Sequence, residues 1–148
     1  MGKQRSVSRF RVVSAAPEAI FALLVDPSQH SLIDGSGTVK ASRSEPGVRL
    51  GLGSTFGMNM KFGAPYNIEN TVVEFEENRL LAWRHFGGHR WRYELEPVEG
   101  GTKVTESFDW STSKSPLILE LTQSPKRNAK AIEKTLDLLA ARFAIPQG

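Results

Sequence analysis

The chain has 148 residues, of which 39% are hydrophobic and 24% charged, an ordinary composition for a globular protein. Its 19 basic and 16 acidic residues leave a net charge of only +3 with no long basic run, so charge gives no support to nucleic-acid binding. The absence of cysteine excludes disulfides, thiolate catalysis and thiolate zinc sites.

The hydropathy of the chain bears on membrane insertion and on cellular location. No apolar run approaches the roughly 20 residues of a membrane span. The first residues, MGKQRSVS, lack the apolar core of a signal peptide. We therefore expect a cytoplasmic protein without a membrane span, folded as one domain over residues 1–148. A monomer and a homodimer are both left open.

The N-terminal part predicts one strand followed by two short helices. Residues 7–13 alternate in hydropathy, with Phe10 and Val12 on one side, as a strand does. Pro17 then stands at a favourable first helical position before an apolar run, and a second start signal follows it. The breaker DGSG at 34–37 ends this helical part.

From about residue 38 to 112 the apolar period becomes two, and short glycine-rich turns separate the segments. Connections this short make neighbouring strands antiparallel. The six strands predicted here span 38–49, 54–62, 66–76, 79–86, 89–97 and 102–111.

The period then returns to 3.6 residues. Ser115 and Ser124, each followed by proline, predict two helix starts with serine as the cap. The second opens a long helix to about Phe143 with an apolar stripe that includes Leu136. A sheet with one apolar face and a long amphipathic helix bury these faces against each other. The predicted fold class is α+β, a curved antiparallel sheet around a long C-terminal helix.

Two turns decide which side chains share a face of this sheet. A two-residue loop in FGG would place Trp83 and Trp91 on opposite sides. A three-residue loop pairs them and uses Gly88 as its left-handed residue. We choose the three-residue loop because it gathers the large aromatics on one buried face. The next turn, VEGG, read as a four-residue loop, then pairs Tyr93 with Glu106 on the same face.

The inner face predicted in this way mixes aromatic, methionine and a few polar side chains. This mixture describes a ligand cavity better than a dry core, and methionines adapt to varied apolar ligands. The predicted ligand-binding residues are Phe56, Met58, Met60, Phe62, Trp83, Trp91, Tyr93, Phe108, Trp110 and Leu136.

The order of elements resembles that of the START-like helix-grip superfamily, in its SRPBCC or polyketide cyclase/dehydrase branch, over nearly the whole chain. Three stretches carry the resemblance: SAAPEAIFALLVDPSQHSLIDG, RLLAWRHFGGHRWRYELEP and GGTKVTESFDWS. It implies a seven-stranded antiparallel sheet that grips the C-terminal helix around a deep cavity for an apolar small molecule. Members include lipid carriers, polyketide aromatases and cyclases, and chaperone coactivators, and no motif here selects one of them.

A metal site would draw on His30, His85 and His89, with Asp34 or Glu106 as an acidic ligand. Against this, the FGG turn places His85 and His89 at the tip of a hairpin, at the rim of the cavity or outside it. We therefore expect no metal and no nucleotide cofactor.

The main prediction is the binding of a small hydrophobic or amphipathic molecule. The first alternative is cyclase- or dehydratase-like catalysis, in which a partly desolvated Glu106 acts as acid or base, Tyr93 orients a substrate oxygen and His85 relays protons. The plainer interpretation of Glu106 is a buried carboxyl group held by Tyr93 or Asn70 without chemistry.

The second alternative is a coactivator-like protein-interaction module. It would use the outer face of the sheet, where Arg84, Arg90 and Arg92 gather. The same register places Arg90 opposite Asp109, an arrangement that favours an ion pair between them.

Overall fold

Among the residues that the computed structural model describes, which are 5–33, 39–42, 49–62, 64–85 and 87–143, seven strands form one antiparallel sheet. Their order is β1-β7-β6-β5-β4-β3-β2, so every strand after β1 neighbours the next one in the chain and β7 closes back onto β1. This confirms the predicted sheet. The strands are β1 Ser6–Val13, β2 Val39–Ser42, β3 Thr55–Phe62, β4 Ala64–Glu76, β5 Leu80–His85, β6 Arg90–Val98 and β7 Gly101–Asp109.

The helices begin close to where the proline signals predict them. They are α1 Pro17–Leu24, the 3-10 helix η1 Pro27–Gln29, α2 His30–Ile33, α3 Pro116–Leu121 and α4 Ser124–Arg142. The cap predicted at Ser124 is wrong. The chain turns sharply between α3 and α4 by placing Gln123 in the left-handed conformation at φ 59°, and Gln123 is the N-cap. Ser115 does precede α3, but its side chain makes no capping hydrogen bond.

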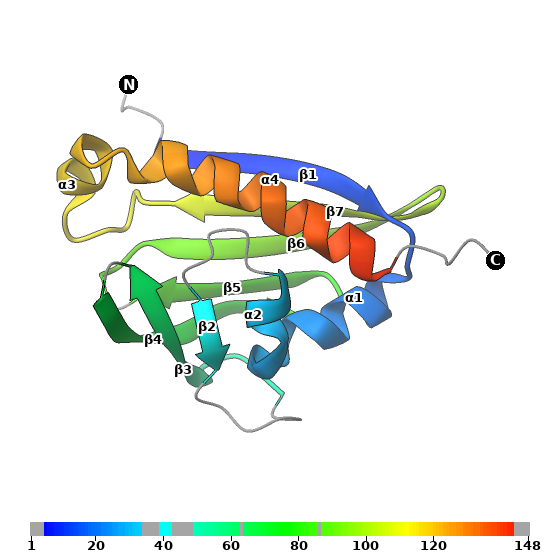
Figure 1. Ribbon diagram of the computed structural model, residues 1–148. Coiled ribbons are helices and arrows are strands. Elements are labelled where there is room, and N and C mark those ends of the chain that lie inside the picture. The colour runs from blue at the N-terminus through cyan, green and yellow to red at the C-terminus, as the bar shows by residue number, and fades with distance from the viewer. Residues whose placement is uncertain (1–4, 34–38, 43–48, 63, 86, 144–148) are drawn as a thin grey trace.

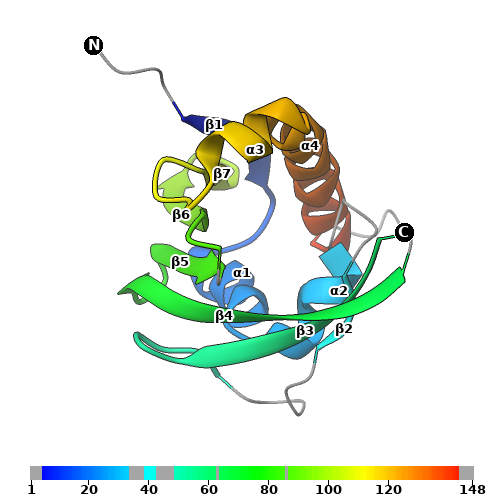
Figure 2. The same cartoon turned by 90° about the vertical axis from the view of Figure 1, so that its left-hand side faces the viewer.

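The sheet curves around the helices. Figure 2 shows it as an arc with α4, α1 and α2 on its concave side, and Figure 1 shows α4 lying along β1 and β7. Ile132, Leu136 and Leu139 of α4 are buried in the core against this side, as the predicted apolar stripe requires. Within the described residues, no helix is long and apolar enough to cross a membrane.

β1 presents its arginines to the helix, whereas Phe10 and Val12 lie on the exposed side. Val7, Arg9 and Arg11 pair in register with Phe108, Glu106 and Val104 of β7, and so belong to the concave face. Arg9 Nε lies 3.0 Å from Glu133 Oε1, and Arg11 forms an ion pair with Asp137, so that two ion pairs join the edge strand to α4. Phe10 and Val12 share a side as predicted, but that side is the exposed one.

The two hairpin registers are confirmed. Trp83 pairs with Trp91, and Gly88 takes a φ of +100° in the three-residue loop. A Cβ atom at Gly88 would stand only 2.4 Å from the Thr112 carbonyl oxygen, so glycine is required there on two counts. In the next hairpin Tyr93 pairs with Glu106. That ladder runs one residue pair further than predicted, to Val98 opposite Gly101, and leaves a two-residue turn at 99–100.

Only part of the second predicted strand falls within the described residues. Of the expected segment 38–49, residues Val39–Ser42 form β2, while 38 and 43–48 lie outside the described residues. Leu50 is not in a strand; its amide donates to the Val25 carbonyl oxygen at 2.7 Å, and its side chain is buried in the core. The DGSG breaker at 34–37 also lies outside the described residues.

Candidate functional site

Three rows of side chains cross the concave face of β3 to β7. The first row joins Trp83, Trp91 and Phe108, which are directly opposite one another on β5, β6 and β7. The Trp91 and Phe108 ring centroids lie 4.8 Å apart. Phe108 is fully buried, whereas Trp83 and Trp91 are only partly buried. This row forms the middle of an aromatic wall that faces the helices.

His30 extends this wall from the helical layer. It begins α2, and its ring stacks on Trp83 with the centroids 5.3 Å apart. Phe56 of β3 meets both rings edge-on, with centroid distances of 5.6 Å to His30 and 5.4 Å to Trp83. His30 Nε2 donates to the Leu24 carbonyl oxygen at 2.8 Å, which fixes the ring. The sequence suggests His30 only as a metal ligand, because so short a helix has no periodic pattern that would predict the orientation of this ring.

The second row contains the two histidines of the FGG hairpin. Asn70 of β4 lies opposite both Phe56 and His85, and the His85 amide donates to the His89 carbonyl oxygen at 2.9 Å. The two imidazole rings stack with their centroids 4.4 Å apart, and His89 also meets Phe108 edge-on at 5.3 Å. The histidines therefore lie against the aromatic wall and are partly buried.

The protonation state of this stacked pair is set by burial. Burial lowers the pKa of His85 below its ordinary value of 6.5. It also lowers the pKa of His89, helped by repulsion from a charged His85, to about 4. His85 Nδ1 accepts a hydrogen bond from the Gly87 amide at 3.0 Å, so the proton of the neutral ring sits on Nε2. Both rings are neutral near pH 7.

The three histidines do not come together. His30 stacks on Trp83 while His85 and His89 stack on each other. Within the described part of the chain, no three residues among His, Cys, Asp and Glu are grouped so that they could hold a metal ion. Asp34 lies outside the described residues.

The third row brings Leu81, Tyr93 and Glu106 together across β5, β6 and β7. Tyr93 is 5% exposed and Glu106 is 4% exposed, so a tyrosine and a carboxylic acid stand side by side within the protein. Glu106 also faces Arg9 on the neighbouring strand β1. The predicted pairing of Tyr93 with Glu106 is thus present in the backbone register.

Other predicted partners of Glu106 lie in different rows. Asn70 belongs to the histidine row on β4 and not to the row of Glu106 on β7. The tryptophan row lies between His85 and the Tyr93 row. Along β5, His85 is four residues from Leu81 of the Tyr93 row, which is a distance of roughly 13 Å. The backbone therefore brings Tyr93 and Glu106 together but places His85 apart from them.

The remaining predicted ligand-binding residues are placed as follows. Leu136 of α4 is buried in the core, and Trp110 stacks on Phe108 with its centroid 5.6 Å away. The Trp110 indole Nε1 donates to Glu120 Oε1 of α3 at 3.0 Å. The side chains of Met58, Met60 and Phe62 lie outside the described residues, although their backbone forms part of β3.

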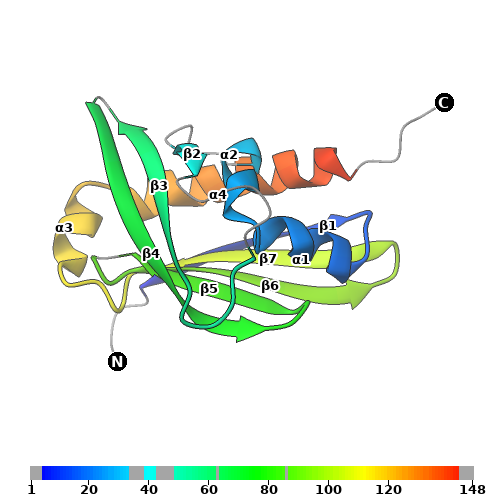
Figure 3. The ribbon, with the colours of Figure 1, turned by 90° about the horizontal axis from the view of Figure 1, so that it is seen from below.

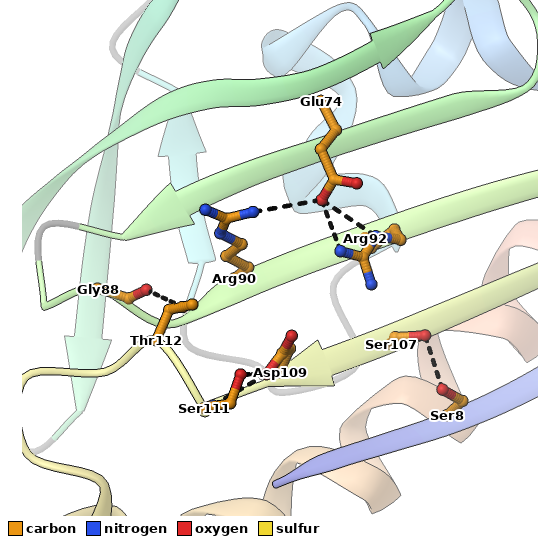
Figure 4. Close-up of polar contacts among 9 residues, drawn as sticks. All are labelled: Ser8, Glu74, Gly88, Arg90, Arg92, Ser107, Asp109, Ser111 and Thr112. Atoms are coloured by element: carbon orange, nitrogen blue, oxygen red, sulfur yellow. Dashed lines mark hydrogen bonds and ion pairs between the residues drawn. The ribbon is translucent and has the colours of Figure 1, made fainter.

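The outer face carries a different arrangement (Figure 4). Glu74, Ala82 and Arg92 are opposite one another on β4, β5 and β6, and Arg92 reaches across the small Ala82 to Glu74. Its Nη2 and Nε donate to Glu74 Oε2 at 2.6 and 3.2 Å, which raises the pKa of Arg92. Arg90 Nη1 lies 3.6 Å from the same oxygen. Arg90 therefore forms its ion pair with Glu74 and not with Asp109 as predicted. The predicted register, in which Arg90 lies opposite Asp109, is confirmed.

The stacked histidines make the stability of the protein depend on pH. The pKa of His89 is about 4 in the folded protein and close to 6.5 when unfolded, so between these values the unfolded chain binds more protons. The free energy of unfolding should therefore fall as the pH drops from about 6.5 to about 4, by at most about 3 kcal/mol from this group. Urea denaturation of the protein and of His89→Leu across this range checks the prediction. A difference between the two that does not change with pH would contradict it.

Comparison with known proteins places this fold in a family. Residues 4–144 match the family described as polyketide cyclase/dehydrase and lipid transport. An uncharacterized protein of Mycobacterium tuberculosis is 41% identical over 144 residues, which are 93% of this chain and 64% of that protein. The chain thus spans less than two thirds of the length of this curated relative.

Solved structures agree in fold. A protein from Chromobacterium violaceum gives a TM-score of 0.72 at 15% identity, with 94% of this chain and 96% of that chain covered. An AHSA1-like protein from Aeromonas hydrophila gives 0.67 at 19% identity, with 97% and 98% covered. The predicted helix-grip architecture is therefore confirmed. With its seven-stranded sheet, its C-terminal helix and a family match over nearly all of its length, the chain belongs to the polyketide cyclase/dehydrase and lipid transport family.

Proposed function

We propose that the protein binds a small apolar or amphipathic molecule, of a lipid- or polyketide-like kind, against the concave face of the sheet. The observation that carries this proposal is the state of Trp83 and Trp91. Both point to the helical side and pack on the core, yet both remain only partly buried. Covering accessible aromatic surface contributes about 25 cal/mol for each Å² removed from water, so two indole rings supply substantial affinity.

The polar residues of the wall support selection among such ligands. Burying a carboxyl group is costly, and Glu106 is buried beside Tyr93 in the row next to the tryptophans. A few polar groups within an apolar surface fix the orientation of a bound molecule. Tyr93 and Glu106 would recognise a polar group of the ligand, and the tryptophan row would cover its apolar part.

The outer face gives less support to the coactivator-like alternative. Glu74 binds both Arg90 and Arg92, so one carboxylate partly neutralises the cationic group on which that alternative depends. The family description names cyclase/dehydrase activity and lipid transport, both of which handle apolar molecules. We therefore place the function on the concave face.

Removing one indole ring should weaken ligand binding. For Trp91→Ala we expect the affinity for laurate or anilinonaphthalene sulfonate to fall about tenfold or more, since lost apolar contact costs about 1–3 kcal/mol. Isothermal titration and fluorescence measure this, and Trp91→Phe should retain most of the affinity. The matched control is Phe10→Ala. It removes an aromatic residue that is 64% exposed and lies on the side of β1 away from the concave face. Equal binding by Trp91→Ala and Phe10→Ala would overturn the proposal.

The buried pair of Glu106 and Tyr93 favours one second candidate, which is acid–base catalysis of cyclisation or dehydration in a polyketide-like substrate. If Glu106 transfers a proton, Glu106→Gln should lower turnover of a poly-β-ketone thioester analogue by about 100-fold or more, because general acid–base groups contribute factors of this size. Substrate affinity should change much less. Turnover is followed by product chromatography and affinity by titration. Unchanged turnover in Glu106→Gln would exclude this role.

A further inference from the structure

Helix α3 exposes three large apolar side chains at one end of the molecule. Leu117, Ile118 and Leu121 are 63%, 60% and 82% exposed, and together they are called the α3 patch here. Figures 1 and 3 show α3 at the end of the fold, beyond the start of α4. Single exposed leucines are common, whereas three large apolar residues exposed on a helix of six residues favour an interaction surface.

The α3 patch is held outward by contacts on the opposite side of the same helix. Leu119 packs against the core, and Glu120 Oε1 accepts hydrogen bonds from Arg5 Nε at 2.9 Å and from the Trp110 indole at 3.0 Å. These bonds fix the rotation of α3 about its axis. The exposure of the α3 patch is therefore built into the packing of the helix.

The segments on either side of α3 in the chain are rich in positive charge. Between residues 111 and 130 the sequence carries four basic residues and one acid. The acid is Glu120, which is bound to Arg5 and Trp110. The basic residues are all exposed, and they are Lys114, Lys126, Arg127 and Lys130.

We propose that the α3 patch docks the protein on the surface of an anionic lipid bilayer. Leucine and isoleucine side chains insert at the level of the lipid headgroups, while lysine and arginine contact the negative phosphates. Each basic side chain close to such a surface contributes about 1 kcal/mol. An apolar helix at one end of the molecule, flanked by cations, matches both requirements.

The charges argue against a second copy of the chain as the occupant. A two-fold interface brings the same patch of both subunits together, so it would face the basic residues around α3 with their own copies. Like charges brought together in this way repel, whereas an anionic bilayer neutralises all of them at once. The cationic rim therefore favours lipid over self-association.

The docking surface is joined to the aromatic wall. The Lys114 amide donates to the Gly87 carbonyl oxygen at 2.9 Å, and the Thr112 hydroxyl donates to the Gly88 carbonyl oxygen. These two hydrogen bonds connect the segment before α3 to the histidine hairpin. Docking through α3 would bring this end of the wall close to the bilayer. Docking does not depend on ligand binding by the wall, so the two proposals can fail separately.

Vesicle co-sedimentation tests the docking. We expect binding to vesicles of phosphatidylcholine with about one third phosphatidylserine, weaker binding to pure phosphatidylcholine, and weakening by salt, because exposed charges are screened. Leu121→Glu should lower the partition coefficient at least about tenfold. The matched control is Leu52→Glu, a residue that is 70% exposed in the loop before β3, and it should bind like the wild type. The double variant Lys126→Gln/Lys130→Gln should lose about 30-fold on the anionic vesicles only.

The proposal is overturned if the wild type does not bind the anionic vesicles or if Leu121→Glu binds as well as Leu52→Glu. It is also overturned if sedimentation velocity without lipid shows a dimer that Leu121→Glu dissociates, because the α3 patch would then be a self-association surface. Titration of laurate in solution separates the two proposals. Leu121→Glu should bind laurate like the wild type, whether or not docking is confirmed.

Discussion

The placement of side chains on the concave face depends on the register of β5, β6 and β7. Successive side chains of a strand point to opposite faces, so a slip of one residue would move every tryptophan to the outside. Two turns fix the register. Gly88 at φ +100° closes the first hairpin, and the turn at 99–100 closes the second. The aromatic wall and the buried Glu106 follow from these two short segments.

This register also divides the charges of the sheet. On the outer face one carboxylate, Glu74, serves two arginines across the small Ala82. On the concave edge Arg9 and Arg11 pair with acids of α4 and fasten the helix to β1. Exposed ion pairs of this kind contribute about 0–1 kcal/mol each. They therefore orient α4 over the sheet more than they stabilise it, and burial of the apolar stripe of α4 supplies most of the binding energy between the layers.

Alternation and turn chemistry predict the sheet, its hairpin registers and the long helix, because these depend on contacts between sequence neighbours. Contacts that depend on how the layers pack are missed. His30 stacks on Trp83 from a helix of four residues, and nothing in its local sequence announces this. Phe10 follows the alternation of a strand yet faces solvent, since the arginines of β1 are drawn inward by acids far along the chain. The exposed leucines of α3 likewise depend on Glu120 binding to Arg5 and Trp110.

The proposed function requires a small apolar molecule to bind against the tryptophan row on the concave face. The chain has three tryptophans, so an NMR spectrum of the nitrogen-15-labelled protein should contain three indole N–H signals that report on three positions of the wall. On titration with laurate, we expect large shifts for the Trp83 and Trp91 signals and a smaller one for Trp110, whose indole N–H donates to Glu120. Saturable shifts confined to the outer face, at Arg90 and Arg92, with the indole signals unchanged, would contradict it.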